Sequence, residues 1–278
     1  MQPGLQADQV YEPARPWRRE GRHATLTATT MVTLQEHEVD VTTPTGPMRT
    51  LVFAPTGSGR HPGIVLSSEI FQITAPVRRL ATFLAGHGFL VAVPEVFHDL
   101  EPRGCVLPYD QAGADRGNAH KLARPIAAFD ADARAVLDHL RALPTCTGRL
   151  GAMGICLGGH LAMRAALQPD VLATACCYAT DIHKGSLGRS GDDTLARLGE
   201  VRGELRMIWG RHDPHIPEAG RRLIHERMTA AGVSFSWHEW NGAHAFLRDE
   251  HSSGRYDPAL ARLTWDLILE LFLRRLRE

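Results

Sequence analysis

A cysteine flanked by closely spaced glycines lies near the middle of the chain, in the segment GICLGGH (154–160). The strand-like run RLGAM precedes this segment, and the helix-like run LGGHLAMRAALQ overlaps its end. The pattern fits G-x-S-x-G with cysteine in the serine position, which is typical of a sharp strand-to-helix turn that exposes a nucleophile. We interpret Cys156 as this nucleophile; a buried structural cysteine and a glycine-rich phosphate turn are the alternatives.

The start of a helix suits a reactive cysteine chemically. The positive end of the helix dipole and the unpaired N–H groups of the first turn favour the thiolate over the thiol. The backbone N–H of Leu157 could then donate a hydrogen bond to the oxyanion that forms when the sulfur attacks a carbonyl. The segment therefore predicts both an attacking group and part of its stabilisation.

An acid and a histidine follow Cys156 at the ends of two later strand-like runs. Asp213 follows ELRMIWG in the segment GRHDPHIP, and His244 follows SFSWHEW in NGAHAF. The chain order nucleophile, acid, histidine is that of catalytic triads on open α/β sheets. His212, Asp213 and His215 could also be drawn as metal ligands, but so short a loop rarely closes a site alone, and we expect no metal.

These residues require a framework that brings strand ends together. Two runs, EHEVDVTT and MRTLVFAP, are separated by PTGP and predict an antiparallel hairpin. Strand-like and helix-like runs then alternate, which predicts a mainly parallel sheet with helices on both faces. The predicted strands are 62–68, 89–93, 149–154, 171–179, 204–210 and 234–240. The predicted helices are 75–87, 129–142, 157–168, 218–231 and 258–276.

Two segments fall outside this alternation. Residues 1–33 show neither helical nor strand periodicity, and we expect a flexible extension before a single domain at 34–278. Residues 94–128 join a strand to a helix, a connection far longer than is usual between such elements. Because long loops at this edge of a sheet are often functional, we expect 94–128 to be a loop that covers the site.

Composition narrows the class of protein. The chain has 278 residues with 31 Lys and Arg against 31 Asp and Glu, so no excess of positive charge favours nucleic acid. No apolar run is long enough to span a membrane, and the first thirty residues lack the apolar core of a signal peptide. Five cysteines without regular spacing argue against a disulfide framework. We expect a cytoplasmic monomer or weak homo-oligomer.

Four segments together carry a resemblance to a known family: SSEIFQ (67–72), GICLGGH (154–160), GRHDPHIP (210–217) and GAHAFLRDE (242–250). From about residue 35 to its end, the chain resembles the dienelactone hydrolases, or carboxymethylenebutenolidases. The resemblance implies an α/β-hydrolase fold and a triad of Cys156, Asp213 and His244. It also implies a small lactone or ester as substrate and no cofactor.

The resemblance assigns further roles. Glu69 would control the proton of the cysteine, and the N–H of Ile70 would be the second oxyanion donor beside Leu157. The family holds a substrate carboxylate with two arginines, and Arg248 matches one of them by position. The other arginine is replaced by Asp99 in the segment PEVFHD. Arg103, later in the same segment, is the candidate replacement.

The sequence thus predicts a hydrolase that opens a lactone or cleaves a small activated ester through an acyl-enzyme on Cys156. One alternative is a general carboxylesterase with the same triad. Another is a ligand or redox sensor that has the hydrolase scaffold without catalysis, in which Cys156 is oxidised rather than acylated.

Overall fold

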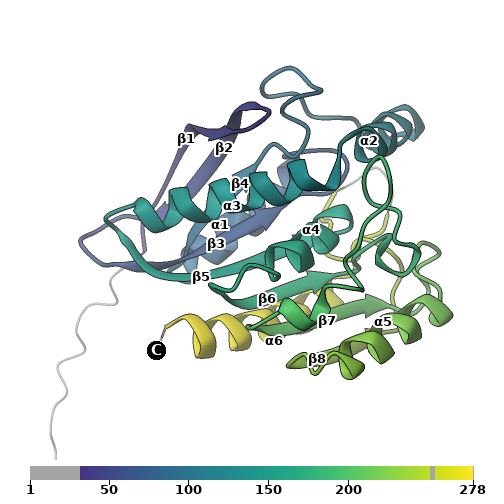
Figure 1. The fold of residues 1–278 in the computed structure, drawn as a ribbon. Helices are drawn as coiled ribbons and strands as arrows, with labels where there is room; N and C mark the ends of the chain where they lie inside the picture. The colour runs from purple at the N-terminus through teal and green to yellow at the C-terminus, as the bar shows by residue number, and fades with distance from the viewer. Residues whose placement is uncertain (1–31, 251–253, 278) are drawn as a thin grey trace, which may run out of the picture. The chain divides into compact units, whose positions relative to one another are not determined.

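The computed structural model describes residues 32–250 and 254–277, and within them eight strands form one sheet (Figure 1). Their order across the sheet is β1-β2-β4-β3-β5-β6-β7-β8. The strands are β1 (Leu34–Thr43), β2 (Gly46–Pro55), β3 (His61–Ser67), β4 (Leu90–Pro94), β5 (Cys146–Ile155), β6 (Val171–Cys177), β7 (Glu204–Gly210) and β8 (Phe235–Trp240). The pairs β1–β2 and β2–β4 are antiparallel, and all other pairs are parallel.

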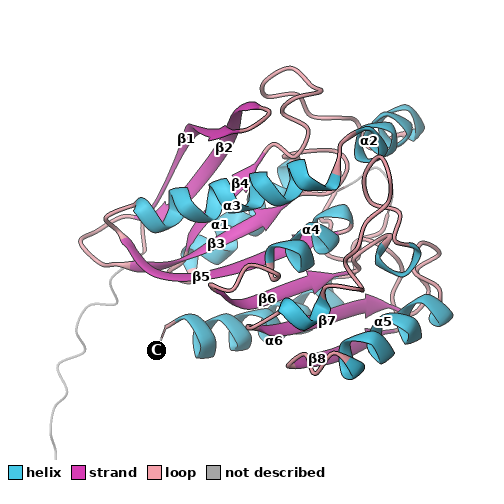
Figure 2. Ribbon diagram, viewed as in Figure 1, coloured by secondary structure: helices cyan, strands magenta, loops and turns pink. Residues whose placement is uncertain are grey.

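Helices cover both faces of this sheet (Figure 2). They are α1 (Ala75–Gly86), α2 (Gln111–Ala123), α3 (Ile126–Ala142), α4 (Leu157–Ala165), α5 (Glu218–Ala230) and α6 (Pro258–Leu276). Helices α3 and α4 pack on one face, and α1 and α6 pack on the other, where the rings of Phe83 and Trp265 are 4.2 Å apart. The predicted fold class, a mainly parallel α/β sheet of the hydrolase type that opens with an antiparallel hairpin, is confirmed.

The strands in the middle of the sheet are more deeply buried than the edge strand β8. The central strands β3, β5, β6 and β7 are buried along most of their length, as near-continuous apolar runs must be between two helical layers. The edge strand β8 is only half-buried along most of its length. No helix within the described ranges combines the length and hydropathy needed to cross a membrane. Of the predicted N-terminal extension, only Val32 and Thr33 lie inside the described residues.

The segment 94–128 differs from its prediction, because it contains helix α2 rather than a loop alone. Asp110 caps α2, accepting a hydrogen bond from the Gly113 N–H at 2.8 Å. The helix has no apolar stripe: within it only Gly113 and Gly117 are buried. Hydrophobic periodicity therefore could not reveal it. A Cβ at Gly117 would lie 2.4 Å from the carbonyl oxygen of Ile70, so glycine allows α2 to approach the end of β3.

Candidate active site

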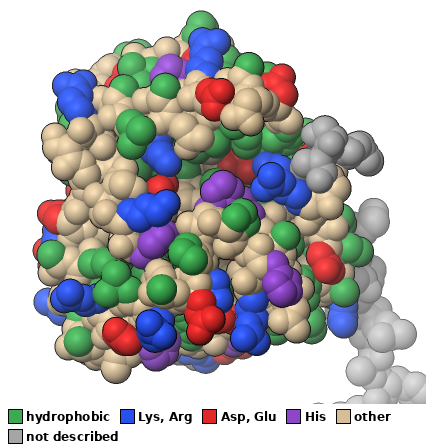
Figure 3. Space-filling model, turned by 90° about the vertical axis from the view of Figure 1, so that its right-hand side faces the viewer, with side chains coloured by type: hydrophobic (Ala, Val, Ile, Leu, Met, Phe, Trp, Pro, Cys, Tyr) green, Lys and Arg blue, Asp and Glu red, His purple; other side chains and the backbone are tan. Residues whose placement is uncertain are grey.

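The carboxyl ends of parallel strands bring the predicted residues together. Glu69 follows β3, Cys156 follows β5, Asp213 follows β7, and His244 follows β8. Glu69, Cys156, His244 and Arg248 all line one cavity of about 460 Å³. Segment 94–128 supplies part of the lining through Tyr109 and α2. The face of the molecule seen in Figure 3 shows histidines and basic side chains gathered around its centre.

The turn at Cys156 is strained and firmly held. Cys156 has φ +56° and ψ −122°, a conformation that non-glycine residues rarely adopt. Its N–H donates to the carbonyl of Cys177 at 3.1 Å, and its own carbonyl accepts from Thr180 at 3.2 Å. Such strain persists only where surrounding contacts impose it, and it is common at functional sites. The residue keeps 9% of its surface exposed, and it lines the cavity.

Two glycines make this turn possible. A Cβ at Gly154 would lie 1.9 Å from the Gly158 carbonyl oxygen, and a Cβ at Gly158 would lie 2.0 Å from the Ser67 carbonyl oxygen. Both neighbours are backbone atoms, which cannot swing away as a side chain can. The glycines therefore allow β3, β5 and α4 to pack closely beneath the cysteine.

We expect Gly158→Ala to destabilise the fold by about 3 kcal/mol, because the added methyl group must displace backbone of β3 or α4. Urea denaturation of both proteins measures the difference. Gly86→Ala is the matched control: a Cβ there meets nothing within 4 Å, and alanine favours the helical conformation. Equal stability of Gly158→Ala and wild type would contradict the close approach.

His244 and Asp213 form a buried hydrogen-bonded pair. Nδ1 of His244 lies 2.6 Å from Oδ2 of Asp213, and Oδ1 of Asp213 accepts the His215 backbone N–H at 2.8 Å. Burial alone would lower the pKa of His244, but Cys156 and Asp213 together raise that pKa to about 9. Cys156 acts on the imidazole both by charge and by a hydrogen bond. The thiol and the imidazole are thus within reach of proton exchange.

Glu69 is buried and held by two partners. The Tyr109 hydroxyl donates a short hydrogen bond to Oε1, and Arg248 Nη1 lies 3.2 Å from Oε2. Burial raises the pKa of Glu69, and the Arg248 charge and the Tyr109 hydrogen bond only partly offset that effect. Within the described part of the chain, no hydrogen bond joins Glu69 to Cys156. Glu69 therefore faces Tyr109 and Arg248 in this conformation.

Two backbone N–H groups, one next to Glu69 and one next to Cys156, have no hydrogen-bond acceptor in the part of the chain that the structure describes. Among residues 32–250 and 254–277, neither the Ile70 N–H nor the Leu157 N–H donates to a protein acceptor. Ile70 follows Glu69 after β3, and Leu157 opens α4 directly after Cys156. Unpaired N–H groups of this kind are the donors from which oxyanion holes are built.

Known proteins are similar to this chain in sequence and in fold. A family model described as "Dienelactone hydrolase family" matches residues 48–276. A Saccharomyces cerevisiae protein named "Putative carboxymethylenebutenolidase" is 39% identical over 241 residues, which are 83% of this chain and 88% of that protein. This chain belongs to the dienelactone hydrolase family. Membership makes it a hydrolase, as its motifs predict.

Two further dienelactone hydrolase comparisons agree. The "Carboxymethylenebutenolidase" of Pseudomonas putida is 28% identical over 197 residues, covering 69% of this chain and 77% of that protein. The crystal structure of a "Putative Dienelactone Hydrolase" from Klebsiella pneumoniae superimposes with a TM-score of 0.77 at 21% identity. That superposition covers 87% of this chain and 99% of the other, and it establishes the common fold.

The structure does not bring Arg103 to the cavity. Its guanidinium group is half-exposed and pairs with Glu38 at 2.9 Å and with Asp40, two acids of strand β1. Asp99, which stands where the dienelactone hydrolase pattern has arginine, pairs instead with Arg124 at 2.8 Å. The expectation that Arg103 replaces the missing arginine is therefore corrected: acids on the adjacent hairpin hold its charge away from the site.

Several cavity residues carried no recognisable signal in the sequence. Tyr109 lies in segment 94–128 without a motif, yet its ring packs over Arg248 at 4.3 Å and against Phe71 at 4.7 Å. The ring of Tyr178, buried after β6, lies 5.1 Å from that of His244. The Tyr109 and Phe71 rings line the cavity, the Tyr178 ring packs behind it against His244, and only tertiary structure could place them.

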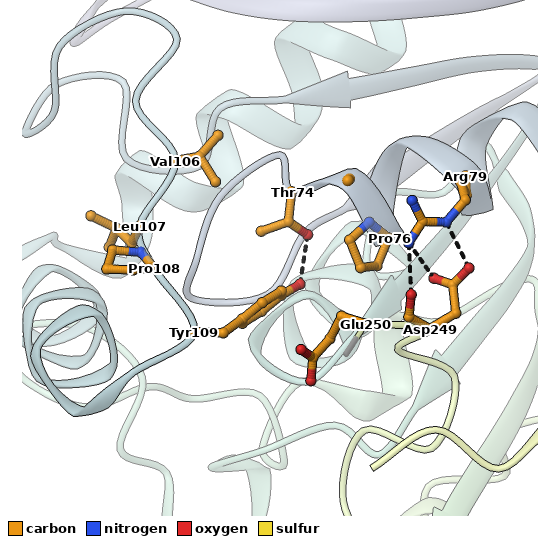
Figure 4. A pocket seen from close by; sticks show the side chains of 10 residues that line it. Thr74, Pro76, Arg79, Val106, Leu107, Pro108, Tyr109, Asp249 and Glu250 are labelled. Carbon is orange, nitrogen blue, oxygen red and sulfur yellow. Dashed lines mark hydrogen bonds and ion pairs between the residues drawn. The ribbon is translucent and has the colours of Figure 1, made fainter. Parts of the chain in front are cut away.

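A second cavity of about 410 Å³ adjoins the first (Figure 4). Tyr109 lines both cavities, and its hydroxyl lies 2.7 Å from Oγ1 of Thr74 at the start of α1. On the far side, Arg79 makes a two-pronged ion pair with Asp249. Tyr109 is thus shared by the linings of the two cavities.

Proposed function

We propose that this protein opens lactones or cleaves small activated esters, with Cys156 as the nucleophile. The observation that carries the proposal is the interaction of Cys156, on a strained turn in a cavity, with an imidazole that is itself bonded to Asp213. Relatives named carboxymethylenebutenolidase support a lactone as the substrate.

In the first half-reaction, Glu69 takes the thiol proton of Cys156, and the thiolate attacks the substrate carbonyl and forms a carbon–sulfur bond. His244, with its raised pKa, enters this step as the imidazolium. The carbonyl oxygen becomes an oxyanion that accepts hydrogen bonds from the Ile70 and Leu157 amides. Each such donor is worth about 3 to 4 kcal/mol of barrier. When the oxyanion collapses, the carbon–oxygen bond of the ester breaks, and the imidazolium of His244 supplies the proton that the leaving alkoxide needs.

In the second half-reaction, neutral His244 takes a proton from water, and the hydroxide attacks the thioester. Collapse of this intermediate releases the carboxylic acid and the Cys156 thiolate, which regains its proton from Glu69. Asp213 accepts a hydrogen bond from Nδ1 of His244, which fixes the ring orientation and leaves Nε2 for catalysis. All protons and electrons balance with water as the only co-substrate.

Glu69 controls the thiol in this proposal. A carboxylate beside the cysteine can accept the thiol proton once its present partners release it. Tyr109 and Arg248 hold Glu69 now, so substrate that displaces either contact would free the carboxylate. The raised pKa of Glu69 makes it a better base than an exposed glutamate.

We expect Tyr109→Phe to shift the pH dependence of Cys156 alkylation by iodoacetamide. Phenylalanine keeps the ring contacts but removes the hydrogen bond that lowers the pKa of Glu69, and a hydrogen bond to a charged group is worth about 1.5 to 3 kcal/mol. The acid limb should therefore move to higher pH by about one unit. Tyr256→Phe, at an exposed tyrosine, is the control. Superimposable profiles for all three proteins would exclude this role for Tyr109.

Turnover of defined substrates tests the proposed function. Purified protein should hydrolyse cis-dienelactone and p-nitrophenyl acetate with saturation kinetics, without added metal or cofactor. If neither compound is turned over above the rate in buffer, the proposal is wrong.

A further inference from the structure

The second cavity, of about 410 Å³, is large enough to hold a small organic molecule. Its lining is mostly apolar, and the ring of Tyr109 forms part of it. The other apolar lining residues are Ala75, Pro76, Val106, Leu107 and Pro108. Val106 is half-exposed, so apolar surface of this cavity is in contact with water. A ligand made largely of carbon would cover that surface, which is favourable.

The charged side chains of the second cavity are compensated. Arg79 donates to Asp249 through both Nε and Nη2. Glu250 Oε1 lies 3.6 Å from Nε of Arg248. Each of these charges therefore has a partner of opposite sign. A charged ligand would lose its hydration here without gaining a counter-charge, so the cavity suits a neutral molecule.

Thr74 supplies a buried hydroxyl group to the lining. It directly precedes helix α1, a position where threonine commonly caps a helix, yet among the described residues its side chain makes no capping hydrogen bond. Its Oγ1 lies instead 2.7 Å from the Tyr109 hydroxyl, a contact that Figure 4 shows as a dashed line. The hydroxyl of Thr74 is thus directed to the side chain that both cavities share.

A count of protons determines what this hydroxyl can still bind. Glu69 is paired with Arg248 as a carboxylate, which only accepts hydrogen bonds, so the Tyr109 hydroxyl donates its one proton to Glu69. The proton between Tyr109 and Thr74 must then come from Thr74. Oγ1 of Thr74 keeps a lone pair but no proton for a ligand. A ligand that bonds to this oxygen must therefore be the donor.

We propose that the second cavity binds a small neutral alcohol with an apolar skeleton. Its hydroxyl donates to Oγ1 of Thr74, and its carbon atoms pack against the apolar lining. Hydrogen bonds then run from the alcohol through Thr74 and Tyr109 to Glu69, which links this site to the group that controls the thiol. An alcohol released by ester cleavage belongs to this class, but the site itself does not depend on the proposed function.

Two ligands with the same skeleton test the direction of the hydrogen bond. In calorimetry, wild type should bind 1-phenylethanol about fivefold more tightly than acetophenone, which can only accept; one hydrogen bond between neutral groups is worth about this factor. Thr74→Val keeps the shape of the side chain, and no helix cap is lost. This variant should bind the two ligands with equal affinity. Wild type that shows no preference for the alcohol would refute the proposal.

Tyr109→Phe tests the count of protons. Phenylalanine keeps the ring but removes the oxygen to which Thr74 donates, so the Thr74 hydroxyl becomes able to donate as well as accept. Acetophenone should then bind about as tightly as 1-phenylethanol. A preference for the alcohol that stays as large as in wild type would contradict the inference.

Ala75→Leu tests the location of the site. Ala75 is exposed and lines the second cavity but not the cavity that contains Cys156. Leucine should lower the affinity for 1-phenylethanol about tenfold, because the ligand must compete with the added side chain for space. Ala219→Leu, at an exposed alanine of α5 outside both cavities, is the matched control and should leave the affinity unchanged.

These binding measurements need no turnover, so they separate the two proposals. If 1-phenylethanol binds as expected while no ester is hydrolysed, the proposed function fails and the alcohol site stands. Equal affinity for 1-phenylethanol in Ala75→Leu and wild type would place the ligand elsewhere and overturn the inference, whatever the turnover of esters.

Discussion

Replacing Cys156 by alanine should lower kcat/KM for p-nitrophenyl acetate on the order of 10⁵-fold, the loss expected when a nucleophile is removed from a triad. Alanine cannot form the thioester, so only the oxyanion donors and binding remain to assist water. The variant should fold normally, because alanine meets the same φ of +56° as cysteine and fills less space. Steady-state kinetics and a thermal melt measure both expectations.

Cys105→Ala controls for the loss of a thiol. Cys105 is partly exposed and lies outside the cavity that contains Cys156, so its removal should change kcat/KM by less than about twofold. Turnover by Cys156→Ala within tenfold of wild type would mean that another group attacks the substrate.

Replacing Asp213 by asparagine should lower kcat by on the order of 10⁴-fold. Asparagine matches the shape of aspartate and can still accept the His215 N–H, but it no longer holds His244 in the required tautomer. Asp213 also raises the pKa of His244, so the variant has a less basic imidazole. We expect His244 to set the alkaline limb of the wild-type rate profile, and this limb should therefore move to lower pH in the variant.

The shift of this limb distinguishes a role in catalysis from simple unfolding. Asp266→Asn removes an exposed carboxylate that only approaches Arg262 at 3.9 Å, and it should alter neither the rate nor the profile. A large rate loss in Asp213→Asn with an unmoved alkaline limb would argue against the proposed link between Asp213 and His244.

Local signals in the sequence predicted the framework of the site. The glycines around Cys156 are required because a Cβ at Gly154 or Gly158 would lie about 2 Å from a backbone oxygen, so the motif reflects a physical constraint on this turn. Asp213 and His244 were predicted because each follows an apolar run, and parallel strands deliver their following loops to one edge of the sheet. Position after a strand thus predicted which side chains would meet.

Other features depend on tertiary contacts that no local pattern records. Helix α2 has no apolar stripe, and its Gly117 allows the helix to lie close to the backbone of Ile70. The position of Arg103 in the chain predicted that it would reach the site. In the structure its guanidinium group instead pairs with two acids of β1.

Trapping the covalent intermediate tests the central claim most directly. Wild-type protein mixed with p-nitrophenyl acetate and quenched in acid within milliseconds should gain the mass of one acetyl group. Peptide mapping by mass spectrometry should place it on Cys156, with no such gain in Cys156→Ala. An acetyl group that maps to a different residue and disappears as product forms, or rapid turnover with Cys156 never acetylated, would contradict the account.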